Sequence, residues 1–129
     1  IETILKETQT IAVVGLSSRP ERAGHYVPAY LQEAGYRIIP VNPTLTEALG
    51  ETAYPDLLHV PDRVDLVLIF QRSENVPPFV DQAIAIGAKS VWMQQGIIHH
   101  TAAETAREAG LQVVMDACMM VEHRRRNRR

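Results

Sequence analysis

Several features that would assign a protein to a particular class are scarce or missing in this sequence. Cys118 is the only cysteine among 129 residues, which excludes an internal disulfide framework and is typical of a reducing compartment. No apolar run approaches the ~20 residues that cross a membrane, and the start of the chain has no signal-peptide pattern. The formal net charge is only -2, so no overall field favours nucleic acid or a membrane surface. We therefore expect a cytoplasmic protein with no membrane partner, in which residues 1–129 form a single domain with one core.

Groups suited to catalysis or metal binding are also scarce. The sequence has no pair of carboxylates and no spacing typical of metal ligands. His99 and His100 are adjacent, and neighbouring residues of a helix do not share a face, so exposed polar positions are the simpler interpretation. Cys118 and His123 lie five positions apart, on poorly matched faces of a helix, and we interpret Cys118 as a buried structural thiol. We predict no catalytic and no metal-binding residues.

The sequence does contain a regular series of short apolar runs rich in Val and Ile. They occur at residues 11–16, 36–41, 64–70, 88–93 and 111–115. They do not alternate with polar residues, which is typical of parallel strands buried on both faces. Helical patterns fill most of the gaps, at residues 1–9, 24–35, 73–88, 100–110 and from 116 into the C-terminal tail. This alternation predicts an α/β fold, a Rossmann-like doubly wound parallel sheet of about five strands with helices on both faces.

Two helix starts and one connection carry more specific expectations. Thr101 and Glu104 form a capping-box pattern, and Asp116 is a suitable N-terminal cap for the last helix. Residues 42–63 contain three of the eight prolines and lack clear periodicity. We expect a short helix or an irregular crossover there, since a full strand follows at once.

The connection after the first predicted strand has a composition suited to an anion. It reads VVGLSSRPERAGHYV over residues 13–27, where a strand is followed by a helix whose N-terminus offers unpaired N–H groups. A glycine permits a tight turn, hydroxyls can bond to phosphate oxygens, and guanidinium groups add charge and planar donors. The residues concerned are Gly15, Ser17, Ser18, Arg19 and Arg22. The alternative is a polar surface loop in which the arginines pair with Glu21 or face solvent.

The first turn does not carry the usual dinucleotide-binding pattern, because the G-x-G-x-x-G spacing is missing. The second predicted strand also lacks the acidic residue that would hold the ribose hydroxyls of NAD, and it ends at Val41, Asn42 and Pro43. Asn42 can still bond to a ribose or a phosphate, and Pro43 can cover an adenine face. The simpler alternative is an Asn-Pro turn. The pattern therefore disfavours NAD.

The ends of the third and fourth predicted strands face the same crevice, because doubly wound sheets bind ligands at the carboxyl ends of their strands. After the third strand, Arg72 can meet a second phosphate or pair with Glu74, and Val76 begins an apolar lip. Glutamines and Gly96 follow the fourth strand. A crevice with arginines, few acids and an apolar lip suits coenzyme A (CoA), which combines several phosphates with an adenine and a long pantetheine arm.

Five motifs in this order resemble those of a known family: VVGLSSRPERAGHYVPAYL, VNP, RSENVPPFVDQAI, GAKSVWMQQGI and VVMDACMMVEH. From about residue 8 to residue 124, the chain closely resembles the single-domain bacterial CoA-binding proteins, which are similar to the CoA-binding N-terminal domain of the succinyl-CoA synthetase α-subunit. The resemblance implies that the CoA phosphates lie on the first loop, the adenosine near the ends of the second and third strands, and the pantetheine toward residues 93–96. The predicted ligand contacts are Gly15, Leu16, Ser17, Ser18, Arg19, Arg22, His25, Val41, Asn42, Pro43, Phe70, Gln71, Arg72, Val76, Met93, Gln94 and Gly96. Three positions depart from the family pattern: Gln71 and Ala117 each lack a positive group expected near the ligand, and His25 lacks a serine hydroxyl expected for a phosphate.

These patterns predict a protein that binds CoA or an acyl-CoA, alone or with a protein partner, in a binding or sensing role without catalysis. The synthetase reaction uses a phosphorylated histidine from a further domain, which these residues do not include. One alternative is an NAD(H)-binding oxidoreductase or redox sensor. Another is a nucleic-acid-binding module that uses the basic tail from about residue 123, although a solvated terminus explains that tail more simply. A mixed disulfide between Cys118 and the CoA thiol is also open, and the sequence predicts neither the acyl group nor the oligomeric state.

Overall fold

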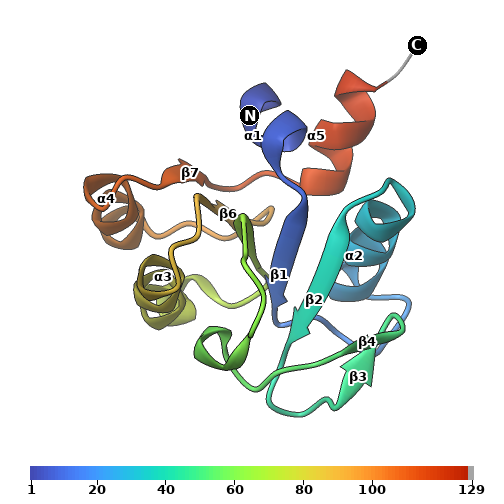
Figure 1. The fold of residues 1–129 in the computed structure, drawn as a ribbon. Coiled ribbons are helices and arrows are strands. Elements are labelled where there is room, and N and C mark those ends of the chain that lie inside the picture. Colours follow the sequence, from blue (N-terminus) through green and yellow to red (C-terminus); the bar gives the residue numbers. More distant parts are fainter. Residues whose placement is uncertain (128–129) are drawn as a thin grey trace.

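A computed structural model describes residues 1–127 of the chain. Its centre is a parallel sheet of five strands in the order β2-β1-β5-β6-β7 (Figure 1). The strands are β1 (Thr10–Val14), β2 (Arg37–Val41), β5 (Leu66–Ile69), β6 (Ser90–Met93) and β7 (Gln112–Val114). The chain runs from β1 outward to β2, then returns to the other side of β1 with β5 and continues to the opposite edge. Doubly wound sheets bind their ligands at such a reversal, outside the carboxyl ends of the strands.

Helices cover both faces of the sheet (Figure 1). On one face, α1 (Glu2–Glu7), α2 (Ala23–Glu33) and α5 (Met119–Arg126) contribute to one hydrophobic cluster. On the other face, α3 (Val76–Ala85) and α4 (His100–Glu108) contribute to a second cluster. Within the described part of the chain, none of the helices is long and apolar enough to cross a membrane.

The central strand β1 explains why the apolar runs do not alternate with polar residues. Ile11 and Val13 belong to the cluster with α2, whereas Ala12 and Val14 belong to the cluster with α3, because successive residues of a strand point to opposite faces. All four are at most 1% exposed. Helices cover both faces, so the four consecutive positions from Ile11 to Val14 are all apolar. The predicted Rossmann-like, doubly wound sheet with helices on both faces is confirmed.

Residues 42–63 differ in part from the prediction. They contain a hairpin of two short strands, β3 (Glu47–Ala48) and β4 (Glu51–Thr52), and a 3-10 helix, η1 (Leu57–His59). Both central residues of the hairpin turn have positive φ, as a tight two-residue turn requires. The crossover is irregular as expected. The sequence pattern does not predict the hairpin, because strands of two residues leave no periodicity to detect.

The start of α4 differs from the expected one. The helix begins at His100, and the Nδ1 atom of His99 accepts a hydrogen bond of 3.0 Å from the Ala102 N–H. The capping box predicted at Thr101 and Glu104 is therefore wrong. Thr101 already lies inside the helix, so its hydroxyl is not at the capping position.

The start of α5 also differs, because its cap comes from a distant part of the chain. The Met119 N–H donates to Oε1 of Gln94 at 3.2 Å. The expected cap, Asp116, has a left-handed backbone with φ 56°, and its carboxylate accepts from the Gly96 N–H at 2.7 Å instead. Cys118, which precedes the helix, is half-buried, which corrects the expectation of a buried thiol.

A candidate ligand-binding site at the carboxyl edge of the sheet

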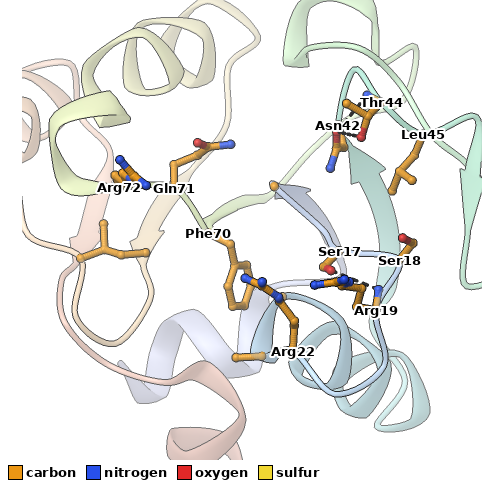
Figure 2. A pocket seen from close by; sticks show the side chains of 14 residues that line it. Ser17, Ser18, Arg19, Arg22, Asn42, Thr44, Leu45, Phe70, Gln71 and Arg72 are labelled. Atoms are coloured by element: carbon orange, nitrogen blue, oxygen red, sulfur yellow. Dashed lines mark hydrogen bonds between the residues drawn. The ribbon is translucent and has the colours of Figure 1, made fainter.

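A pocket of about 700 Å³ opens at the carboxyl ends of β1, β2 and β5. Its volume is within the range of small-molecule sites, roughly 300–1,000 Å³. Figure 2 shows side chains from the connections after these three strands around the pocket. The lining residues are Gly15, Ser17, Ser18, Arg19, Arg22, Ala23, Gly24, Asn42, Thr44, Leu45, Phe70, Gln71, Arg72 and Ile97.

The lining is strongly cationic. It contains three arginines and no aspartate or glutamate, although the net charge of the chain is -2. None of Arg19, Arg22 and Arg72 forms an ion pair with any residue that the structure describes. The alternative in which they pair with Glu21 and Glu74 is therefore not found. Three guanidinium groups without a counter-ion around one cavity favour a ligand with several negative charges.

The start of α2 adds backbone donors to this charge. Ala23 and Gly24, its first two residues, line the pocket, and no described side chain caps the helix. The other helices that follow strands differ. His99 caps α4, Gln94 caps α5, and two prolines without an N–H lie in the first turn of α3. Among these helices, α2 is the one whose N–H groups and positive dipole end are available to an anion.

The loop before α2 is held in shape by its own hydrogen bonds. The Ser17 N–H donates to the Gly24 carbonyl at 3.0 Å, and the Arg22 N–H donates to the Arg19 carbonyl at 3.0 Å. Oγ of Ser17 accepts from the Arg19 N–H at 3.1 Å, which leaves the Ser17 O–H donor for a ligand. The loop is therefore preformed, and a preformed loop loses little conformational entropy when it binds.

Gly15 allows this loop to pass close to the end of β5. Its φ is +86°, and a Cβ there would overlap the Phe70 carbonyl oxygen and lie 3.2 Å from Nε2 of Gln71. The Gly15 N–H donates to the Val41 carbonyl at 2.9 Å. The loop is thus fastened to β2 on one side and rests against the end of β5 on the other, and a side chain at this position would push it away.

The structure brings many of the predicted contacts together and leaves others apart. Those in the lining are Gly15, Ser17, Ser18, Arg19, Arg22, Asn42, Phe70, Gln71 and Arg72. Those outside it are Leu16, His25, Val41, Pro43, Val76, Met93, Gln94 and Gly96. The hydrophobic core holds four of these side chains at 2% exposure or less, namely Leu16, Val41, Val76 and Met93. The side chains of these four residues therefore pack in the core and do not face the pocket.

Some lining residues are not predicted from the sequence. They are Ala23, Gly24, Thr44, Leu45 and Ile97. The first two open α2 directly after the arginines, so the helix start is a signal that could identify them. The other three follow β2 and β6 by a few residues. Whether such a residue faces the pocket depends on the path of its loop, which periodicity does not reveal.

Two reactive side chains considered in the sequence, those of Cys118 and His123, lie outside this pocket. Cys118 lines a separate hollow beside Asp116, and the ring of His123 packs edge-on against Tyr30 and Tyr36. Among the residues that the structure describes, no group of three or more His, Cys, Asp or Glu side chains is arranged to hold a metal ion. The chemistry that the pocket itself offers is anion binding.

The chain is similar to small proteins over most of their length and to one part of a larger enzyme. It is 43% identical over 123 residues to the uncharacterized protein YneT of Bacillus subtilis, which covers 95% of this chain and 91% of that protein. A solved structure of a hypothetical protein from Pyrococcus horikoshii has a TM-score of 0.93 and 43% identity, and the match covers 96% of this chain and 87% of that one. An ADP-forming acetate–CoA ligase of Archaeoglobus fulgidus is 26% identical over 121 residues, which are 86% of this chain and 18% of the ligase.

A family model described as the CoA binding domain matches residues 9–124. This span includes every residue of the pocket lining, from Gly15 to Ile97. The match extends over most of the chain, so the resemblance that the five motifs indicate is confirmed. The chain belongs to the CoA-binding domain family.

Proposed function

We propose that this protein binds coenzyme A or an acyl-CoA in the pocket at the carboxyl edge of the sheet. The observation that carries the proposal is the uncapped start of α2, which lines the pocket together with three arginines that form no ion pair within the described residues. Helix N–H groups and guanidinium groups that converge on one cavity are suited to phosphate. The family match supports CoA as the phosphate-bearing ligand.

The arrangement of the arginines fits a ligand with two separate anionic parts. Figure 2 shows Arg19 and Arg22, from the loop before α2, apart from Arg72, with the Arg22 side chain overlapping Phe70 in this view. The start of α2 lies with the first two, so this side suits the pyrophosphate of CoA. Arg72 then suits the 3′-phosphate, which CoA carries on its ribose away from the pyrophosphate. A ligand with a single anionic group would leave one side of the pocket without a counter-charge.

The rest of the lining fits the uncharged parts of CoA. Leu45 and Phe70 provide apolar surface for an adenine, and Ile97 lies toward β6, where the pantetheine is expected. The polar side chains of the lining are those of Ser, Thr, Asn, Gln and Arg, which can form hydrogen bonds with the polar groups of CoA. We therefore propose a binding or sensing role.

Calorimetric titration of the protein with CoA, acetyl-CoA, dephospho-CoA, ADP and NAD tests the proposal. CoA and acetyl-CoA should bind more tightly than dephospho-CoA, ADP and NAD, because only the first two present both the pyrophosphate and the 3′-phosphate. Arg19→Ala and Arg72→Ala should each weaken CoA binding by about ten- to a hundredfold, since a charge-assisted hydrogen bond contributes roughly 1.5–3 kcal/mol.

Arg107→Ala is the matched control, because Arg107 is exposed on α4 and lies outside the pocket. Its affinity for CoA should equal that of the unmodified protein. Arg72→Ala should also reduce the preference for CoA over dephospho-CoA, whereas Arg19→Ala should preserve it. Unchanged CoA affinity in both pocket variants would refute the site, and equal affinity for CoA and NAD would refute the ligand.

A further inference from the structure

Asn42, the first residue after β2, uses almost all of its polar atoms inside the protein. Its backbone N–H donates to the Tyr54 carbonyl at 2.9 Å, and its carbonyl accepts from the Leu45 N–H at 3.2 Å. Oδ1 accepts from both the N–H and the hydroxyl of Thr44, at 2.9 and 2.8 Å. Nδ2 donates to the Leu16 carbonyl at 2.9 Å. Both lone-pair positions of Oδ1 are therefore occupied, so the side chain of Asn42 has no acceptor left for a ribose hydroxyl.

The bond from Asn42 to Leu16 fixes one peptide unit of the anion-binding loop. The carbonyl of the Leu16–Ser17 peptide bonds to Nδ2 of Asn42, and its N–H bonds to the Gly24 carbonyl at 3.0 Å. One residue earlier, the Gly15 N–H bonds to β2. Hydrogen bonds thus hold the loop at the successive residues Gly15, Leu16 and Ser17. The Leu16 carbonyl oxygen accepts from Nδ2 of Asn42, so it is not left unpaired beside a bound anion.

We infer that Asn42 is a positioning residue, which joins the phosphate loop after β1 to the Thr44–Leu45 turn on the neighbouring wall of the pocket. The inference rests on the proposed function, because it assigns to Asn42 the preorganisation of that same site. Figure 2 shows Asn42 and Thr44 at the end of β2, across from Ser17 and Arg19. The side chain at this position binds the ligand indirectly, by keeping two walls of the pocket in register.

This role also explains why position 42 carries an asparagine and not an aspartate. Dinucleotide-binding sheets carry a carboxylate at the end of the second strand, where it accepts from ribose hydroxyls. An aspartate at position 42 would still accept from Thr44, but it has no N–H for the Leu16 carbonyl. It would place a negative oxygen against that carbonyl and beside the phosphates. The amide is therefore the group that can serve both walls at once.

Asn42→Ala and Asn42→Asp test the inference in the full chain, with Asn75→Ala as the matched control. Asn75 is exposed, its side chain makes no capping bond to α3, and it lies outside the pocket. Asn42→Ala should weaken CoA binding about tenfold or more, and Asn42→Asp at least as much. The affinity of both Asn42 variants for ADP and for inorganic pyrophosphate, measured by NMR titration, should fall by a similar factor. The reason is that the same loop would bind the phosphates of all three ligands. Asn75→Ala should bind each of them as the unmodified protein does.

A second measurement separates positioning from direct contact. In the ligand-free Asn42→Ala protein, hydrogen exchange at the Gly15 and Ser17 amides should accelerate, while exchange in α4 should not change. Weakened CoA binding with unchanged exchange would overturn the inference, because Asn42 would then contact the ligand itself. If the Asn42 variants lost affinity for CoA and ADP but kept it for pyrophosphate, the inference would also be overturned, because Asn42 would then contact the ribose. Unchanged CoA affinity in both Asn42 variants would overturn it as well, whereas an unmodified protein that fails to bind CoA would refute the proposed function instead.

Discussion

Gly15 is the residue at which backbone geometry most directly limits substitution in the site. Its positive φ and the overlap of any Cβ with the Phe70 carbonyl act together. We predict that Gly15→Ala lowers the free energy of unfolding by about 2–4 kcal/mol, from backbone strain and overpacking combined. Urea denaturation measures this loss, and calorimetry should show that CoA binding falls with it, because the loop can no longer rest on β5.

Gly87→Ala is the comparison that isolates the steric part. Gly87 also has a positive φ, of +75°, but a Cβ there would meet nothing within 4 Å. Its substitution should cost only the strain of the backbone, about 1 kcal/mol, and should leave CoA binding intact. Equal losses of stability in the two variants would show that the contact with Phe70 is not what makes Gly15 necessary.

At single positions, the sequence predicts a site residue where the chemical group of its side chain suits the ligand. Gly15, Ser17, Arg19 and Arg22 are identified because glycine, hydroxyl and guanidinium groups after a first strand suit phosphate, and they do line the pocket. The role of Asn42 could not be obtained this way. Its partner Leu16 is 26 positions away, and only the pairing of β1 with β2 brings the two together.

Among the helices, α5 depends on Gln94 for its start. This side chain is 5% exposed and accepts from the Met119 N–H. We predict that Gln94→Leu lowers the free energy of unfolding by about 1–2 kcal/mol, because it leaves a buried N–H without an acceptor. CoA affinity should stay within about twofold, since the side chain of Gln94 lies outside the pocket lining and its substitution keeps the backbone carbonyl that accepts from the Ile97 N–H. Urea denaturation and calorimetry check both parts. A large loss of CoA affinity at unchanged stability would place Gln94 in the binding site.

The helix α5 is also anchored to α2 through His123. Nδ1 of His123 lies 2.9 Å from the Tyr30 hydroxyl oxygen, the ring packs edge-on against Tyr30 and Tyr36, and the Arg124 guanidinium lies over the Tyr30 ring. Burial lowers the pKa of His123 from its ordinary value of 6.5. The folded protein therefore favours the neutral imidazole, which places a pH-dependent contact between these two helices.

This lowered pKa gives a signed prediction for stability. The contribution of His123 should be fully present above the unfolded-state pKa, about 6.5, and should be lost as the pH falls through the lower pKa of the folded state. Urea unfolding between about pH 8 and pH 5 measures the loss. In His123→Gln, stability should depend less on pH across this window. A variant with the same pH dependence as the unmodified protein would exclude His123 as the cause.

Element types could be predicted from the sequence more reliably than element ends. The strands are clear because burial on both faces makes them continuously apolar, as β1 shows. The caps are not, because His99 is not a typical N-terminal cap and Gln94 reaches α5 from 25 positions away. The β3–β4 hairpin is missed for a different reason, since two-residue strands carry no period.

In the whole molecule, the positive charge of the pocket and the reversal of strand order coincide at the carboxyl ends of the strands. The chain has a net charge of -2, yet the pocket lining holds three arginines and no carboxylate. The order of strands reverses beside β1, and the alternation of strands and helices predicts this topology because parallel strands need crossovers. What the alternation cannot predict is which loop residues face inward, and this is why Thr44 and Leu45 emerge only from the structure.

NMR titration of the ¹⁵N-labelled protein with CoA tests the central claim most directly, because it reports every amide at once. We predict that the amides of residues 15–24, 42–45 and 70–72 shift on binding, except at Pro20 and Pro43, which have no N–H. The amides of residues 87–90 and 109–112, at the amino ends of β6 and β7, should not shift. Shifts confined to residues 87–90, 109–112 or 122–127, or no shifts at all at saturating CoA, would contradict the account.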